Sequence, residues 1–313
     1  MKMKKTYIAL LVFVAISLLG RSQQDPMFTQ YMFNTLSINP AYAGIADAMS
    51  VTAIHRSQWV GFDGAPVTQT ISLHTPLRKE SISVGGSVVN DQHGPVKQTG
   101  IYADASYRIF FDNSRLAFGL KAGLNLFSAN LLDLNPTTEG DQAFAANISG
   151  KALPNFGFGV MWYNKKTYVG ISTPKLLENE LLDGSLPTFD YNAERRHFFV
   201  IAGTVFPISN YVQFKPSTLI KVVNGAPPGV DVTANFLFYD KFWAGAMYRW
   251  QDALGVLLQY ELNNKFRIGY AFDYTLSNLS KYSNGSHEIM LGIDIGRKWA
   301  GDVSPRFFST RYF

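Results

Sequence analysis

Apolar residues alternate with polar or small residues at every second position through most of the chain after residue 44. In residues 115–126, Leu116, Phe118 and Leu120 share one face, whereas Ala117 and Lys121 lie on the other. The same alternation recurs in residues 101–111, 265–274 and 288–296. A period of two is typical of β-strands with one apolar face. The sequence therefore predicts an all-β fold.

The same period divides the chain into about 14 strands of roughly 8 to 13 residues, an even number and lengths that suit a transmembrane antiparallel β-barrel. They cover residues 48–58, 67–75, 81–89, 98–110, 116–126, 154–163, 167–173, 197–206, 211–223, 229–238, 242–249, 254–261, 265–274 and 288–296. Links after every second strand are short and turn-like, whereas others are long, notably 127–153 and 174–196. In such barrels short turns face the periplasm. We therefore expect both termini to be periplasmic.

Composition agrees with a barrel. Only 16% of residues are charged, against about 25% in typical soluble domains. No apolar run after residue 22 is long enough to span a bilayer as a helix, so membrane insertion would require strands. The alternative is a soluble double-sheet or repeat β-protein, which also alternates. Apolar Phe, Leu, Ile and Tyr on one face of nearly every strand favour the barrel.

The first 22 residues have the three parts of a secretory signal peptide. Three lysines precede an apolar run over residues 7–19, and small Gly20 and Ser22 follow it. These residues hold four of the 28 basic side chains and none of the 23 acidic ones, so removing them lowers the formal charge from +5 to +1. A nucleic-acid partner is not expected without a basic surface.

Chemistry-bearing motifs are scarce. The absence of cysteine excludes disulfides, cysteine-ligated zinc and thiol nucleophiles, and the five histidines lack the paired spacing of a metal motif. The loop 133–141 spaces oxygen ligands as a calcium loop would, but Pro136 interrupts it, so a solvated loop is favoured. We predict no enzyme activity, metal or cofactor. A third possible function class is a soluble β-rich enzyme, but the sequence shows no set of catalytic residues that supports it.

The polar faces of the predicted strands should form the barrel interior. Charges of both signs are expected there: Asp104, Arg108, Lys121, Lys215, Lys221, Asp231, Arg267, Asp273, Glu288 and Asp294. Such charges can pair to stabilise a lumen. Mixed with small residues, they can also leave room for a plug or a polypeptide. Composition does not separate these alternatives.

The stretch QDPMFTQYMFNTLSINPAYAG, residues 24–44, has neither a helix nor a strand period. We expect residues 23–46 to form a non-strand segment between the signal peptide (1–22) and a barrel (47–296), with a C-terminal tail at 297–313. Phe28, Tyr31, Phe33 and Tyr42 would anchor it to the lumen or the periplasmic rim, and Pro40 would fix a turn.

This segment, with HRSQWVGFDGAPVTQTISLHTPL after it, closely resembles the PorP/SprF family of type IX secretion outer-membrane proteins of Bacteroidota. The shared motifs are Asp25 to Asn34, with Thr29 where the family has Ser, then Asn39 to Gly44, Arg56 to Trp59, and residues 285–292. As partner-binding or plug residues the resemblance singles out Asp25, Pro26, Phe28, Gln30, Tyr31, Phe33, Asn34, Asn39, Pro40, Tyr42, Gly44, Arg56, Gln58 and Trp59.

The resemblance implies a non-enzymatic barrel that helps to secrete or anchor surface proteins, such as adhesins with type B C-terminal domains, in some members linked to gliding. It also implies contact with outer-membrane lipid and with other secretion components, including OmpA-like peptidoglycan-binding proteins in some members. The alternative function is a passive porin or uptake channel for small solutes.

Overall fold

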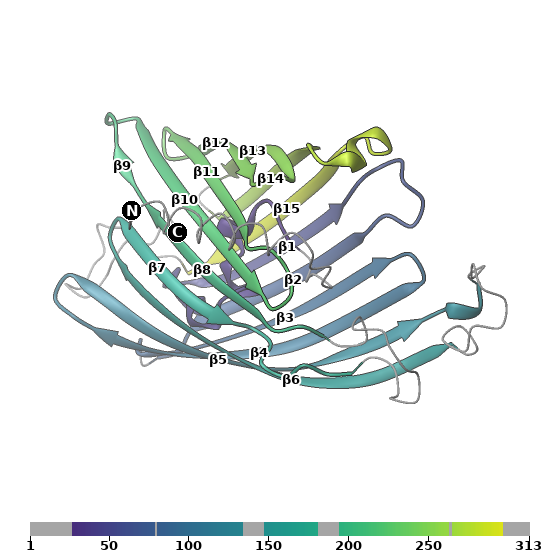
Figure 1. The fold of residues 1–313 in the computed structure, drawn as a ribbon. Helices are drawn as coiled ribbons and strands as arrows, with labels where there is room; N and C mark the ends of the chain where they lie inside the picture. The colour runs from purple at the N-terminus through teal and green to yellow at the C-terminus, as the bar shows by residue number, and fades with distance from the viewer. Residues whose placement is uncertain (1–26, 79, 134–146, 181–193, 263–264, 297–313) are drawn as a thin grey trace, which may run out of the picture.

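The computed structural model describes residues 27–78, 80–133, 147–180, 194–262 and 265–296 (Figure 1). Predicted features outside these ranges include the signal peptide, Asp25 and Pro26, most of the loop 133–141, and the tail. The strands are β1 (Met49–Ser57), β2 (Val67–Pro76), β3 (Ile82–His93), β4 (Val96–Phe110), β5 (Ser114–Ala129), β6 (Ile148–Asn164), β7 (Thr167–Thr173), β8 (His197–Thr204), β9 (Phe206–Pro207), β10 (Val212–Val223), β11 (Gly229–Phe238), β12 (Phe242–Arg249), β13 (Ala253–Leu262), β14 (Phe266–Thr275) and β15 (Ser286–Ile295).

The strands form one closed antiparallel sheet. Each pairs with its neighbour in sequence, and β1 pairs with β15 to close the ring, with Met49 opposite Ile295. Short β9 and longer β8 both pair with β10, so they are two pieces of one strand interrupted at Val205. The barrel therefore has 14 strands, as the alternation predicted. Closure leaves no free sheet edge, which in lipid would expose unpaired backbone groups.

Two details differ from the expectation. The predicted strand 197–206 is split, and β3, β4, β5 and β6 are longer than predicted, with 12, 15, 16 and 17 residues. The extra length of β4, β5 and β6 carries a small apolar cluster of Phe127, Ala129 and Leu153, with Val96 and Ile148 against it. Burial of this cluster stabilises strand pairing in a region where apolar and polar residues alternate less regularly.

The outer surface of the barrel is apolar. Large exposed side chains alternate with buried ones along the strands, as with Ile101, Leu120, Val256, Ile268 and Leu291. Exposed aromatic residues gather near the strand ends, including Tyr107, Phe206, Tyr211, Phe242, Tyr248, Trp250 and Tyr274. A contiguous apolar surface of this kind suits lipid rather than water, and aromatic residues favour the two membrane interfaces.

The two rims of the barrel differ. We call the rim with the links β2–β3, β4–β5, β6–β7, β9–β10, β11–β12 and β13–β14 the turn end, and the rim with the links β1–β2, β3–β4, β5–β6, β7–β8, β10–β11, β12–β13 and β14–β15 the loop end. The turn end holds the short links that the sequence predicted. Antiparallel order also places the start of β1 and the finish of β15 at the turn end.

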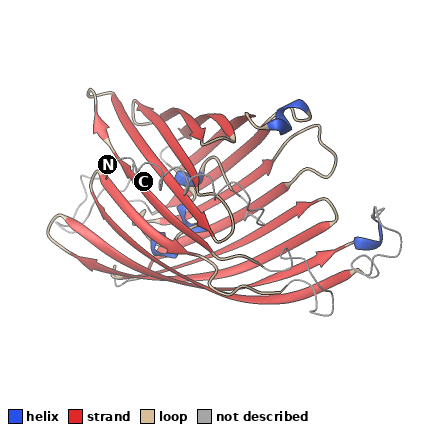
Figure 2. Cartoon of the chain, viewed as in Figure 1, coloured by secondary structure: helices blue, strands red, loops and turns tan. Residues whose placement is uncertain are grey.

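The N-terminal segment, residues 27–48, precedes β1 and lies inside the barrel wall (Figure 2). It contains three 3₁₀ turns of three residues each, η1 (Tyr31–Phe33), η2 (Thr35–Ser37) and η3 (Pro40–Tyr42). Short turns in succession explain why residues 27–44 show no sequence period. Within the described residues, no helix is both long and apolar enough to cross a membrane.

Candidate functional site

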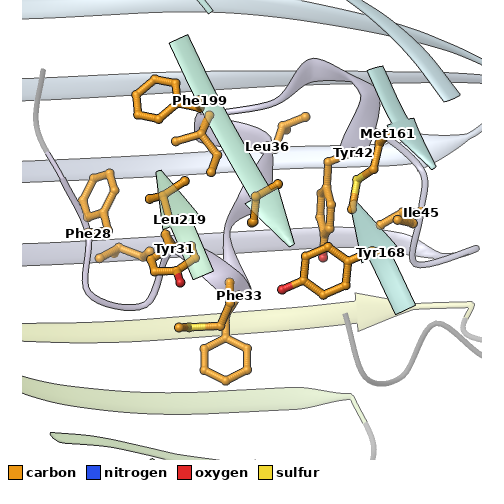
Figure 3. Close-up of a cluster of buried hydrophobic side chains, with 14 of the residues drawn as sticks. Phe28, Tyr31, Phe33, Leu36, Tyr42, Ile45, Met161, Tyr168, Phe199 and Leu219 are labelled. Carbon is orange, nitrogen blue, oxygen red and sulfur yellow. The ribbon is translucent and has the colours of Figure 1, made fainter. Parts of the chain in front are cut away.

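The N-terminal segment supplies much of the apolar core. Phe28, Tyr31, Phe33 and Tyr42 are each less than 10% exposed, and they pack with strand residues that include Met161, Tyr168, Phe199 and Leu219 (Figure 3). Burying a large apolar side chain stabilises by about 1.5–3 kcal/mol. The segment thus acts as the core around which the polar inner faces of the strands pack.

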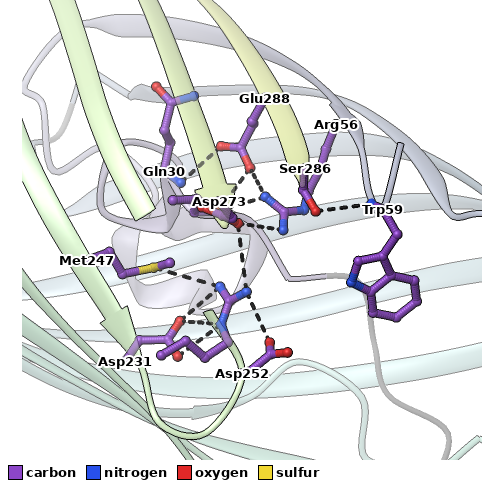
Figure 4. A network of polar contacts seen from close by, with 11 residues as sticks. Gln30, Arg56, Trp59, Asp231, Met247, Asp252, Asp273, Ser286 and Glu288 are labelled. Atoms are coloured by element: carbon purple, nitrogen blue, oxygen red, sulfur yellow. Dashed lines mark hydrogen bonds and ion pairs between the residues drawn. The ribbon is translucent and has the colours of Figure 1, made fainter. Parts of the chain in front are cut away.

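At the loop end, the segment is held by a buried polar group that we call the mouth cluster: Thr29, Gln30, Arg56, Asp273 and Glu288 (Figure 4). The Glu288 carboxylate accepts the backbone N–H groups of Thr29 and Gln30, each at 2.9 Å. Arg56 pairs with Asp273 at 2.8 Å and with Glu288 at 3.1 Å. Hydrogen bonds to a buried carboxylate contribute about 1.5–3 kcal/mol each. The cluster therefore fixes both the backbone and the position of this part of the segment.

The Thr29 hydroxyl completes the mouth cluster. It accepts from Arg56 Nη1 at 2.8 Å and donates to Asp273 Oδ2 at 2.5 Å. A serine hydroxyl can make the same two bonds, which accounts physically for the exchange of Ser and Thr at this motif position. The Gln30 side chain makes no hydrogen bond within the described part of the chain and lies against Gly269. The mouth cluster therefore binds the segment through the backbone N–H groups of Thr29 and Gln30 and through the Thr29 hydroxyl.

Two further ionised residues border the mouth cluster. Arg249 forms three hydrogen bonds of 3.1 Å to Asp231 across β11 and β12, two from Nε and one from Nη2. Its Nη1 lies 4.0 Å from Asp273. Two guanidinium groups thus face three buried carboxylates, those of Asp231, Asp273 and Glu288. The two N–H groups of the segment help to compensate the excess negative charge.

The middle of the segment fits against three strand glycines, which we call the glycine cradle: Gly119, Gly159 and Gly170. A Cβ atom at Gly119 would lie 2.1 Å from the Ala41 nitrogen, and one at Gly159 would lie 2.1 Å from Asn39 Oδ1. At Gly170 it would lie 2.8 Å from Asn39 Nδ2. These contacts leave no space for any side chain. The glycines are therefore needed for the close approach of the segment.

Asn39 and Pro40 shape the turn that enters the cradle. The Asn39 side chain caps η3 by accepting the Ala41 N–H at 2.9 Å, and Pro40 is the first residue of that turn. Proline is favoured there because its fixed φ suits the first helical position. Asn39 also donates to the Val160 carbonyl on β6 at 3.3 Å. These bonds join the segment to the strand wall.

At the turn end, Asp47 anchors the segment. Its carboxylate accepts from Arg108 at 2.7 Å and from Arg115 at 3.0 Å, and Arg108 also donates to the Gly44 carbonyl at 3.1 Å. Gly44 has a φ of +74° and lies against Ser83, so glycine is favoured at this position for both conformation and space. Together these contacts hold the chain where it leaves the lumen and begins β1.

Lys215 has an unusual setting between the segment and the wall. Its ammonium lies 5.6–5.7 Å from the ring centres of Phe33, Tyr168 and Trp243, and it is 1% exposed. Its Nζ has no hydrogen-bond acceptor within the described residues. Cation–π attraction can offset part of the cost of burying this charge.

Another buried carboxylate lies on the lumen side of β5 and β6 near the loop end. Glu194, just before β8, accepts from Asn125 at 2.6 Å, from Asn179 at 2.9 Å and from Asn155 at 3.3 Å. Asn125 and Asn155 lie on the inner faces of their strands and are buried. The described part of the β7–β8 link is thereby fixed to the inner wall.

Three of the sequence motifs that resemble the family meet in the mouth cluster. Thr29 and Gln30 come from the motif at Asp25 to Asn34, Arg56 from the motif at Arg56 to Trp59, and Glu288 from residues 285–292. Gln58 and Trp59 lie beyond β1 in the loop-end link, where Trp59 has a φ of +45° and its N–H donates to Ser286 Oγ at 3.1 Å. Asn34 accepts from Ser72 on β2 at 2.8 Å.

The ten predicted interior charges all lie on the inner side of the wall. Nine are buried, and Arg267 is partly buried beside Asp294 at 3.2 Å. Sequence reasoning missed Asp47, Arg115 and Arg249, and the role of the cradle glycines. Arg115 and Arg249 occupy inward positions on their strands, but neither is among the interior charges predicted above. Asp47, the partner of Arg115, lies on the distant N-terminal segment, so strand spacing does not reveal that pair.

No group of three or more His, Cys, Asp or Glu side chains within the described residues is arranged to hold a metal ion. In the mouth cluster, the carboxylates of Asp273 and Glu288 are paired with Arg56, and Glu288 also accepts backbone N–H groups of the segment. What the arrangement does chemically is to fix a peptide segment inside a closed barrel.

Comparison with known families agrees with the motifs. Residues 20–293 match the family of the type IX secretion system membrane protein PorP/SprF. The chain belongs to the PorP/SprF family. Membership assigns this barrel to type IX secretion in the outer membrane and implies association with other components of that system. No curated protein matches the chain.

Solved structures similar to this PorP/SprF barrel include Omp33 of Acinetobacter baumannii, at 9% identity and a TM-score of 0.43, covering 80% of this chain and 99% of that one. A KdgM porin has 9% identity and a TM-score of 0.36, covering 78% and 98%. A triple mutant of Rhodopseudomonas blastica porin has 10% identity and a TM-score of 0.34, covering 79% and 99%. With TM-scores below 0.5, these likenesses carry no argument about function.

Proposed function

We propose that this PorP/SprF barrel helps to secrete or anchor particular surface proteins, which it engages through their C-terminal domains at the loop end. Its N-terminal segment acts as a plug that closes the lumen. The loop end faces the cell exterior and the turn end faces the periplasm, where other secretion components, such as an OmpA-like peptidoglycan-binding protein, bind. The barrel performs no chemistry of its own.

One observation supports this proposal: residues of the family motifs hold the N-terminal segment inside the lumen. Thr29 and Gln30 are bound to the mouth cluster, and residues 39–41 lie in the glycine cradle. A general solute channel has no need of a buried aromatic core in its pore. A closed barrel that serves as a docking platform needs its lumen sealed and its rims rigid.

The test compares cells lacking the chain with cells complemented by it. Surface proteins are released from intact cells by protease and identified by mass. We expect one or a few surface proteins to vanish without the chain and to return on complementation. An unchanged set of surface proteins, with slower uptake of small solutes, would instead support the porin alternative.

A second measurement is the conductance of the purified barrel in planar bilayers. A barrel plugged by the segment is expected to give no large, steady open-pore current. Large currents that need no client protein would contradict the plug and favour the porin.

A further inference from the structure

The N-terminal segment runs through the lumen in one direction. Asp47 is bound to Arg108 near the end of β4 and to Arg115 near the start of β5, both at the turn end. Thr29 is instead bound beside the loop end. In Figure 3, Phe28 and Ile45 lie at opposite sides of the buried cluster. The two ends of the segment therefore lie near opposite rims.

The positions of the mouth-cluster residues on their strands fix this direction. Arg56 is the second-last residue of β1, Asp273 is two residues before the end of β14, and Glu288 is the third residue of β15. All three strand ends border the loop end. Because Glu288 binds the N–H groups of Thr29 and Gln30, Met27 can lie at most two residues away from this rim contact. Met27 is only partly buried, whereas residues 28–36 are buried.

We infer that Met27 belongs to the loop-end surface of the barrel, so that the start of the segment is part of the contact that a secreted client protein makes at the mouth. The client half of this inference rests on the proposed function; the position of Met27 does not. The alternation of short turns and long links predicts both termini in the periplasm, on the side of the short turns. The direction of the segment instead puts Met27 at the loop end, opposite the short turns.

The surroundings make the loop end a rigid contact surface. The β1–β2 and β14–β15 links are joined by bonds from the Val60 N–H to the Gly285 carbonyl at 2.8 Å and from the Asn284 N–H to the Val60 carbonyl at 2.7 Å. Exposed Phe62 and Tyr282 lie in the same two links. A fixed surface with exposed aromatic side chains loses little entropy on binding a protein.

The test uses single cysteines, since the chain has none of its own. Met27→Cys is compared with Asp63→Cys in the loop-end link β1–β2 and with Asn113→Cys in the turn-end link β4–β5, both exposed positions. Each is labelled with a membrane-impermeant maleimide in intact and in permeabilised cells. We expect Met27→Cys to label under the same conditions as Asp63→Cys. Labelling together with Asn113→Cys, or no labelling in a correctly assembled barrel, would overturn the inference.

The client contact is tested separately with a photo-crosslinking amino acid at position 27 in secreting cells. A crosslink to a surface protein is expected. If the cysteine has the sidedness of Asp63→Cys but no crosslink forms, the topology stands and the client contact at Met27 is refuted. A matched crosslinker at position 113 should not reach the same protein.

Discussion

Replacing Glu288 with alanine should release the loop-end half of the N-terminal segment. The change removes the acceptor of two backbone hydrogen bonds of 2.9 Å and one of the two carboxylates that pair with Arg56. At about 1.5–3 kcal/mol for each bond to a charged group, the two backbone bonds alone amount to roughly 3–6 kcal/mol. A loss of about 4 kcal/mol corresponds to roughly a 10³-fold shift in an opening equilibrium.

The assay measures how often the segment opens. Met32, 1% exposed, is replaced by cysteine in the otherwise cysteine-free chain, and its labelling by a small maleimide is followed in the purified barrel. When labelling is limited by the opening equilibrium, Glu288→Ala should raise its rate by about 10³-fold. Glu288→Gln keeps one acceptor oxygen of similar shape and should show a smaller increase of about 10- to 100-fold.

The matched control is Asp294→Ala. Asp294 is a buried carboxylate on the same strand, but its bonds go to Ser50 and Arg267 of the wall. It should leave the labelling rate of the segment cysteine nearly unchanged. If Glu288→Ala also leaves the rate within about threefold of the parent, worth less than about 1 kcal/mol, the anchoring role of the mouth cluster is refuted.

Three further predictions concern the rest of the segment. Gly119→Ala should prevent the segment from packing in the glycine cradle, and the folded barrel should then unfold at a lower temperature, as judged by its mobility on gels. Gly229→Ala is the control, because its Cβ would lie no closer than 3.4 Å to its nearest contact. Equal behaviour of the two variants would contradict the role of the cradle. Asp47→Ala leaves two buried guanidinium groups without this partner and should cost about 3 kcal/mol in denaturant unfolding, and a loss below about 1 kcal/mol would argue against a turn-end anchor. Lys215→Met should change the free energy of unfolding by no more than about 1 kcal/mol, because removal of a costly buried charge offsets the lost attraction to Phe33. A loss of several kcal/mol would mean that the Lys215 ammonium is a principal contact holding the segment.

The strand pattern could be read from the sequence because lipid imposes it locally. Each outward side chain must be apolar regardless of what lies across the barrel, so alternation alone identified all 14 strands and the all-β class. The interruption at Val205 was not predicted, because residues 197–206 read as one strand, whereas the pairing breaks between β8 and β9.

The mouth cluster could not be assembled from the sequence. Arg56 and Glu288 are 232 positions apart and meet only because β1 pairs with β15 when the barrel closes. Similarly, the residues around Gly119 do not predict its contact with Ala41, since a glycine on the inner face of a strand indicates only a small side of that strand. The motifs were found by resemblance, and their physical connection required the register of the strands.

The most direct test of a secretion role is to recover the barrel from mildly solubilised outer membrane of secreting cells and identify by mass what comes with it. We expect a large surface protein to be recovered together with other type IX secretion components. Recovery of the barrel alone, from cells in which that secretion system remains intact and active, would contradict the secretion role.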